Sequence, residues 1–122
     1  MSRVIHFELP ADNPERAVEF YKKVFAWGFQ KWEGPQEYWL VTTGPDTQPG
    51  INGGLLRRQY PGAATCNTIG VTSVDQSVAS ITTHGGKIVV PKMPIPGVGY
   101  LVYCSDTEGN VFGVLQPDAN AK

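Results

Sequence analysis

The sequence predicts an α+β fold made of two copies of one module, in which a strand and a helix are followed by three more strands. The order of the predicted elements repeats with an offset of about 60 residues, and a repeat of this kind bounds the fold before any local pattern does. Gly and Pro supply 14 and 10 of the 122 residues, a share typical of a turn-rich protein with strands. The length predicts a single domain over residues 1–122.

The first module is predicted to begin with a strand over residues 4–9. Side chains alternate along this segment, so that His6 and Glu8 share one face of the strand while Phe7 lies on the other. Pro10 is predicted to end the strand, because proline interrupts the hydrogen-bonding ladder of a sheet.

A helix is predicted directly after this strand. Asn13 is a suitable N-cap and Pro14 a suitable first helical residue. Apolar residues then recur at helical spacing and give an amphipathic helix of about three turns, which Gly28 is predicted to close. Three strands are predicted to complete the module, at about 28–33, 36–43 and 51–57.

The second module repeats this plan from Cys66 onward. Alternation predicts a strand over residues 66–71. Ser73 and Gln76 have the spacing of a capping box, so a helix is predicted to begin there and to end at Gly85-Gly86. Strands follow at 87–90, 99–105 and 111–115, with a proline-rich loop at 91–97 and a turn at 106–110; module one then covers about 3–57, a linker 58–65, and module two about 66–117.

Composition excludes several classes of function. A net charge of −1 gives no basic surface for DNA, RNA or an anionic membrane, and no apolar stretch approaches the roughly 18–20 residues of a membrane span. Cys66 and Cys104 are too far apart for a Cys-x-x-Cys metal site and too few for a disulfide framework. We therefore expect reduced thiols in a cytoplasmic protein.

Three segments resemble a known family. They are residues 6–17 followed by Phe20-Tyr21, then His84-Gly85-Gly86-Lys87, and the turn 106–110. Together with the doubled module, they resemble the vicinal-oxygen-chelate superfamily, which includes glyoxalase I, fosfomycin- and bleomycin-resistance proteins and extradiol dioxygenases. This resemblance covers nearly the whole chain. It implies two modules whose curved mixed sheets enclose a cleft for a small molecule.

The resemblance also implies a degenerate metal site. Family members place metal ligands on the first and fourth strands of each module, and the matching positions here are His6, approximately Gly54, Cys66 and Gly113. A catalytic metal normally needs about three protein ligands, whereas two of these positions are glycines. We therefore expect no metal cofactor. The alternative is a divalent ion (Ni, Zn, Co, Mn or Fe) held by His6 with Cys66 or with Glu8.

His6 and Glu8 are the candidate catalytic residues. A histidine can act as a base near neutral pH, and a carboxylate that faces a concave sheet needs a partner or water. The competing interpretations are a hydrogen-bonded structural histidine and an exposed glutamate at the strand edge. The candidate ligand-binding residues are Tyr38, Asn52, Cys66, Thr68, Tyr100 and Tyr103, although strand aromatics are equally typical of a core and Cys66 of a small buried position.

Two classes of function therefore remain open for a glyoxalase-related protein that acts on or binds a small organic molecule. As an enzyme, it would use Glu8 or His6 to remove a proton next to a carbonyl group, as a lyase or isomerase with or without a metal; a divalent-metal lactoylglutathione-lyase type is one form of this class. As a binding protein of the bleomycin-resistance type, it would sequester its ligand without turnover. The resemblance also implies a homodimer, whose clefts form either within one chain or between exchanged modules.

Overall fold

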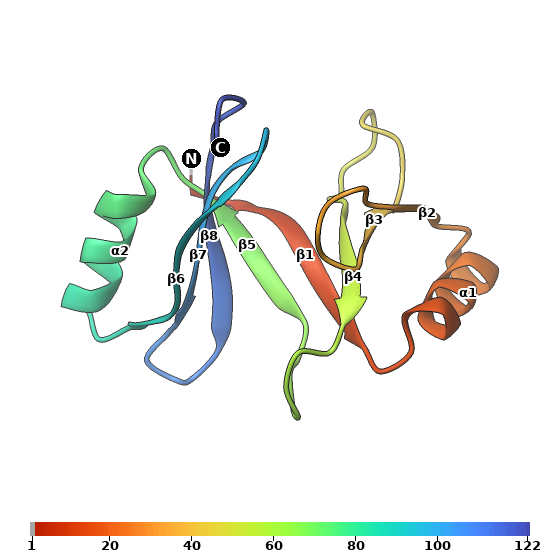
Figure 1. The fold of residues 1–122 in the computed structure, drawn as a ribbon, viewed down its shortest axis with the longest axis horizontal. Helices are drawn as coiled ribbons and strands as arrows, with labels where there is room; N and C mark the ends of the chain where they lie inside the picture. Colours follow the sequence, from red (N-terminus) through yellow and green to blue (C-terminus); the bar gives the residue numbers. More distant parts are fainter. Residues whose placement is uncertain (1) are drawn as a thin grey trace. The chain divides into compact units, whose positions relative to one another are not determined.

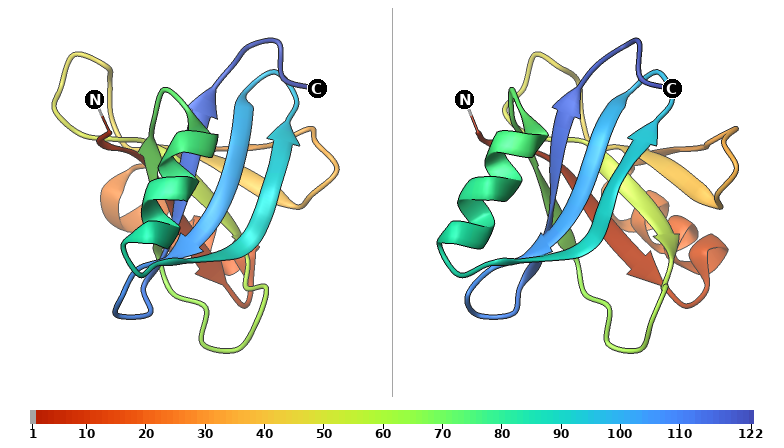
Figure 2. Two further views of the ribbon diagram at one scale, coloured as in Figure 1. Left: turned by 90° about the vertical axis from the view of Figure 1, so that its left-hand side faces the viewer. Right: turned by 60° about the vertical axis from the view of Figure 1, so that its left-hand side comes forward.

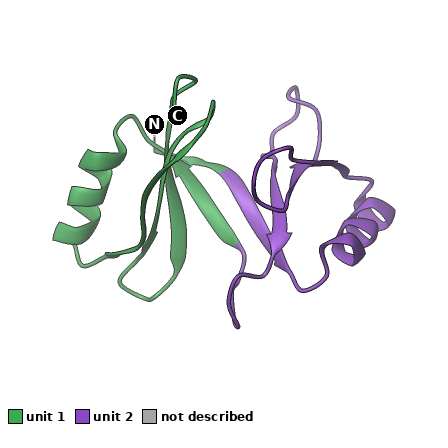
Figure 3. Ribbon diagram, in the orientation of Figure 1, with its two compact units in different colours: residues 1–5, 66–122 green, residues 6–65 purple. Residues whose placement is uncertain are grey.

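The computed structural model describes residues 2–122 and has the predicted α+β fold, with two βαβββ modules (Figure 1). The chain divides into two compact units, which Figure 3 shows in different colours. The first-module unit is His6–Thr65; the second-module unit combines Cys66–Lys122 with Met1–Ile5. That the two modules form one domain stays a prediction.

The first-module unit contains a four-stranded mixed sheet. Its strands follow the order β2-β3-β4-β1, in which β1 and β4 are parallel and the other neighbours antiparallel. β1 continues through Pro10, where the strand was predicted to end, since a proline is tolerated where its nitrogen has no ladder bond to make. The elements are β1 (Val4–Ala11), α1 (Pro14–Phe25), β2 (Gly28–Lys31), β3 (Tyr38–Thr42) and β4 (Gly53–Arg57).

Helix α1 begins as predicted and ends differently. The Oδ1 atom of Asn13 accepts a hydrogen bond from the backbone N–H of Arg16 at 3.1 Å. At the other end the predicted closure by Gly28 is wrong, because Ala26 takes the left-handed conformation with φ 59° and donates its N–H to the carbonyl of Lys22 at 3.0 Å. Gly28 instead begins β2.

α1 covers the apolar face of this sheet. It contacts β4 and β2, and its Val18 packs in a core with Trp39, Val41 and Leu55, of which Leu55 is fully buried. Phe7 packs against the same core. Neighbouring residues of a strand point to opposite faces. His6 and Glu8, which flank Phe7 on β1, therefore lie on the face turned away from α1.

The second-module unit repeats the arrangement. α2 packs against β6, β7 and β8 on one side of the sheet, as both views in Figure 2 show. The predicted cap at Ser73 is confirmed, since its Oγ accepts the backbone N–H of Gln76 at 3.2 Å. No helix in residues 2–122 is long and apolar enough to cross a membrane. Its elements are β5 (Cys66–Gly70), α2 (Val74–Thr83), β6 (Lys87–Ile95), β7 (Gly99–Ser105) and β8 (Val111–Pro117), in the sheet order β5-β8-β7-β6.

The predicted loop at 91–97 is wrong over most of its length. β6 runs from Lys87 to Ile95 and therefore includes Pro91 and Pro94. β6 is the last strand in the order, so one of its edges makes no ladder bonds, and prolines are tolerated there. The pairing of β6 with β7 also shifts register on both sides of Val90. Such irregularity breaks the alternation from which a strand is predicted.

We predict that Ala26→Gly stabilises the protein by about 0.5–1 kcal/mol, because glycine adopts the left-handed conformation of the α1 terminus without a Cβ clash. Urea unfolding followed by circular dichroism measures the change. The matched control is Ala79→Gly on the exposed side of α2, which should destabilise by about 1 kcal/mol. A loss of stability in both variants would contradict the role assigned to the Ala26 conformation.

A candidate small-molecule site on the first module

Three polar side chains meet on the face of the first-module sheet opposite α1. The hydroxyl of Tyr38 donates a hydrogen bond to Oε2 of Glu8 at 2.9 Å and lies 2.8 Å from Nε2 of His6. All three side chains are half-buried. His6 and Glu8 come from β1 and Tyr38 from β3, so one hydroxyl links the two predicted catalytic residues with one of the predicted ligand-binding residues.

Gly54 makes this meeting possible. β4 lies between β1 and β3, and its Gly54 is paired with Glu8 on one side and Leu40 on the other. Tyr38 must therefore reach across β4 to touch β1. A Cβ atom at Gly54 would lie 1.8 Å from the Tyr38 hydroxyl oxygen, so only a glycine leaves room for the phenol.

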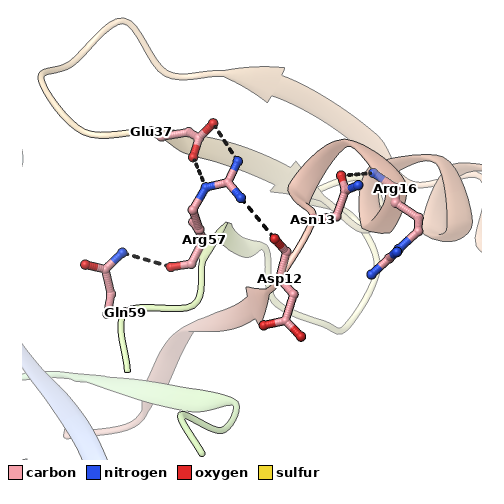
Figure 4. Close-up of polar contacts among 6 residues, drawn as sticks. All are labelled: Asp12, Asn13, Arg16, Glu37, Arg57 and Gln59. Atoms are coloured by element: carbon pink, nitrogen blue, oxygen red, sulfur yellow. Dashed lines mark hydrogen bonds and ion pairs between the residues drawn. The ribbon is translucent and has the colours of Figure 1, made fainter. Parts of the chain in front are cut away.

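Arg57 ties together the ends of the three strands that carry the site (Figure 4). Its guanidinium donates to both carboxylate oxygens of Glu37, at 2.9 and 3.4 Å, and to the backbone carbonyl of Asp12 at 2.9 Å. Glu37 directly precedes Tyr38, and Asp12 directly follows β1. The hydrogen bond from Arg57 lowers the pKa of Glu37. An exposed ion pair contributes little stability by itself, so its main effect here is to fix where β3 starts.

The surroundings of His6 favour its neutral form. Burial lowers the pKa of His6 below its ordinary value of 6.5, and the negative charge of Glu8 opposes this shift without overcoming it. The phenol has one proton, which it gives to Glu8, so a neutral His6 donates from Nε2 to the Tyr38 oxygen. The two hydrogen bonds thus have the same direction, with His6 donating to Tyr38 and Tyr38 donating to Glu8. Nδ1 is then the ring nitrogen of His6 that carries no proton.

Trp32 lies next to Tyr38 in the candidate site, and it was not among the residues predicted from the sequence. Its ring stands at 75° to the ring of Tyr38, with centroids 6.2 Å apart. It lies in the loop between β2 and β3 and folds back over Gly34, where a Cβ would approach the indole to 2.2 Å. The sequence pattern that could have indicated Trp32 is its Trp-x-Gly spacing, two residues ahead of a predicted strand. This pattern is a weak signal.

Asn52 has a structural role in the first-module unit. Its Oδ1 accepts the backbone N–H of Thr43 at 2.9 Å and lies 3.3 Å from the hydroxyl oxygen of the same residue. Asn52 thereby joins the two ends of the loop between β3 and β4. This loop encloses a polar hollow of about 150 Å³. Asn52 does not contact His6, Glu8 or Tyr38 through any of these hydrogen bonds.

The other predicted residues lie in the second-module unit. Thr68 is buried, and Tyr103 is half-buried and paired, like Thr68, with Gly113 of β8. Cys66 is half-buried, and its thiol donates weakly to the carbonyl of Asn67 at 3.7 Å. Tyr100 packs against the core beneath α2, and the ammonium group of Lys92 lies 5.4 Å from the centre of its ring. Tyr100 therefore lies on the helix side of its sheet.

The second module has the same backbone arrangement as the site but different side chains. Gly113 corresponds to Gly54, and a Cβ there would meet Thr68 Oγ1 at 3.0 Å and Leu101 Cδ1 at 3.3 Å. Thr68 and Leu101 thus occupy the positions that Glu8 and Tyr38 occupy in the first module. The acid and the phenol of the first module are thus replaced by a hydroxyl and a leucine at the matching positions of the second module.

The donor set does not fit the metal site of related folds. Among residues 2–122, no group of three or more His, Cys, Asp or Glu side chains is placed to hold an ion. Gly54 offers no ligand atom, and the Tyr38 hydroxyl fills the space from which one would project. Nε2 of His6 is already engaged with that hydroxyl.

An open depression of about 500 Å³ lies on the second-module unit, and it is mostly apolar. No side chain that titrates near neutral pH lines it, so it offers no chemistry comparable with that of the three polar side chains. Its lining residues are Ser2, Ile5, Gly70, Val71, Thr72 and Pro117.

Comparison with known proteins identifies similar sequences and a shared fold. No family model matches the chain. Two curated proteins, from Mycobacterium bovis and Mycobacterium tuberculosis and both named "Putative glyoxylase CFP32", are each 29% identical over 114 residues. The match covers 90% of this chain and 42% of each relative, so the chain spans about two fifths of the length of the curated relatives it matches.

Solved structures agree over the whole fold. A methylmalonyl-CoA epimerase in complex with methylmalonyl-CoA and NH4+ has a TM-score of 0.71 at 14% identity, covering 100% of this chain and 99% of its own. A glyoxalase/bleomycin resistance protein/dioxygenase superfamily member from Vibrio splendidus 12B01 has a TM-score of 0.67 at 17% identity, with 97% and 100% covered. The chain has the vicinal-oxygen-chelate fold. The resemblance seen in the sequence is thus confirmed. The epimerase of Mycobacterium tuberculosis, with a TM-score of 0.71 at 10% identity and 94% and 87% covered, shares this fold.

We predict that Gly54→Ala displaces the Tyr38 ring and breaks both of its hydrogen bonds, because the new Cβ would overlap the hydroxyl. Overpacking of this kind costs about 1–3 kcal/mol. Urea unfolding gives the cost, and removal of the ring in Gly54→Ala/Tyr38→Ala should recover part of it. Gly28→Ala is the matched control, since its Cβ meets only Thr42 at 3.8 Å. Equal stability of Gly54→Ala and wild type would contradict this packing.

We predict that His6 titrates below 6.5, and lower still in Glu8→Gln, because the variant removes the charge that favours imidazolium. NMR titration of the His6 imidazole signals in both proteins measures the two values. The lowered pKa of His6 also makes the stability of the protein depend on pH. As pH falls below 6.5 the unfolded chain binds a proton that the folded chain does not, so stability falls. A rise of the His6 pKa in Glu8→Gln would contradict this account.

Proposed function

We propose that this vicinal-oxygen-chelate chain is an enzyme that moves a proton at the carbon next to a carbonyl group of a small organic molecule, without a resident metal. The observation that carries the proposal is the Tyr38 hydroxyl held between His6 and Glu8. Enolisation needs a base and a donor that stabilises the enolate oxygen. The first-module unit has both within hydrogen-bonding distance of each other.

The proposed step balances within these groups. Glu8 takes the proton from carbon, the C–H electron pair becomes the enolate double bond, and the negative charge moves to the carbonyl oxygen. A protonated Glu8 no longer needs the Tyr38 proton. The phenol O–H is then available to the enolate oxygen as its charge develops, while His6 continues to donate to the phenol oxygen. The proton on Glu8 exchanges with solvent, and return of a solvent-derived proton from Glu8 to carbon completes the cycle.

The comparisons support this choice at a coarser level. The two curated relatives carry the name glyoxylase, and the structural neighbours include a methylmalonyl-CoA epimerase bound to methylmalonyl-CoA. The metal-independent part rests on the donor set, in which Gly54 and Gly113 provide no ligand and Tyr38 occupies the space above Gly54. The homodimer, the cytoplasmic location and a sequestering function of the bleomycin-resistance type stay predictions.

The test is hydrogen exchange at the α-carbon in D₂O, followed by NMR, for methylmalonyl-CoA and for a set of neutral ketones. We expect Glu8→Gln to slow exchange by about 10²- to 10⁴-fold. Tyr38→Phe, which removes one donor to the oxyanion, should slow it by about 10²- to 10³-fold. Glu33→Gln in the exposed loop before β3 and Tyr60→Phe in the linker are the matched controls and should leave exchange unchanged.

Two results would contradict the proposal. Binding without exchange, equal in wild type and Glu8→Gln, would favour a sequestering protein instead. Loss of exchange after treatment with EDTA, restored by a divalent ion, would contradict metal independence.

A further inference from the structure

The rings of His6 and Tyr38 form one flat surface. Their planes differ by 11° and their centroids are 6.5 Å apart. The Nε2–H bond of an imidazole points within the ring plane, and the phenol oxygen lies within its own ring plane. Two nearly parallel planes that share the Tyr38 oxygen are nearly the same plane. The rings therefore lie end to end rather than face to face.

This flat surface has a floor and a side wall. The hydroxyl end of Tyr38 rests on Gly54, where a Cβ would lie 1.8 Å from the oxygen and 2.1 Å from Cζ. The hydroxyl end of Tyr38 is thus supported by β4, and the inference places the ligand on the side of the rings away from Gly54. The indole of Trp32 stands at 75° to the phenol ring and forms an upright side. Together they make a corner lined by aromatic faces, next to Glu8.

We infer that the substrate has a planar, conjugated group attached to its carbonyl, and that this group lies on the surface formed by His6 and Tyr38. This inference rests on the proposed function and specifies its substrate class. A flat ring placed there gains offset or edge contacts with all three aromatic side chains. Its carbonyl oxygen then lies beside the Tyr38 hydroxyl, where an enolate would be stabilised.

Acetophenone and cyclohexyl methyl ketone are suitable probes. Both are neutral methyl ketones with exchangeable α-hydrogens, and they differ in whether the ring is flat. The cyclohexyl ring has no less apolar surface, so simple hydrophobic burial gives acetophenone no advantage. Aromatic contacts should make acetophenone bind roughly two- to tenfold more tightly to wild type. Ligand-observed NMR titration measures both dissociation constants.

The variants separate this inference from the proposed function. Tyr38→Leu and Trp32→Leu should each reduce the preference for acetophenone, and Trp32 lies in the loop between β2 and β3 rather than in the sheet. Tyr38→Phe should lose proton exchange and keep most of the preference, since the ring stays on Gly54. Tyr60→Leu, an exposed aromatic of the linker, is the control and should keep the preference.

Equal or tighter binding of cyclohexyl methyl ketone to wild type would overturn the inference, as would a preference for acetophenone that both leucine variants retain. Failure of both ketones to bind would also overturn it. If exchange on methylmalonyl-CoA still depends on Glu8 in that case, the proposed function stands and only the substrate class is wrong.

Discussion

The site depends on the absence of a side chain at residue 54. His6 and Glu8 are two residues apart on β1, where backbone positions lie about 6.5–7 Å apart, so their side chains need a third group to connect them. Tyr38 supplies that group from two strands away, and it crosses β4 only because Gly54 leaves the space open. The sequence resemblance implies a metal-ligand position at approximately this glycine. In this chain the space above Gly54 holds the phenol hydroxyl of Tyr38.

The two modules separate the requirements of folding from those of chemistry. Each has a glycine on the strand parallel to its first strand, Gly54 in β4 and Gly113 in β8, and each buries the opposite face under one helix. The groups above these glycines differ. Tyr38 and Glu8 are replaced by Leu101 and Thr68, which leaves no acid or phenol in the matching place. The two modules thus share a backbone arrangement, while the hydrogen-bonded His6, Tyr38 and Glu8 occur in the first module.

Much of the fold could be predicted because its determinants are local. The caps at Asn13 and Ser73 need only residues within one turn of the helix, and both predictions are confirmed. The failures have non-local causes. β6 keeps Pro91 and Pro94 because it is the last strand in its sheet order, which no local pattern reveals. Ala26 takes a conformation more usual for glycine, so Gly28 was the wrong choice of helix end.

The candidate site could be predicted in part. Alternation placed His6 and Glu8 on one face, and Tyr38 was among the candidate ligand-binding residues. Their connection depends on the pairing of β3 with β4 and of β4 with β1, which the sequence does not specify. Asn52 has a further role that its position along the strand did not indicate. Its amide oxygen accepts the backbone N–H of Thr43, while its contact with a ligand stays a prediction.

A single phenol proton couples the groups of this site. With His6 neutral and donating to Tyr38, the phenol can donate to one acceptor at a time. An acceptor on a ligand that takes this bond removes it from Glu8. In the proposed enolisation, the phenol would therefore donate to the carboxylate before the proton moves and to the ligand oxygen afterwards. Burial favours the neutral form of His6, which has one N–H, and that N–H donates to the phenol oxygen.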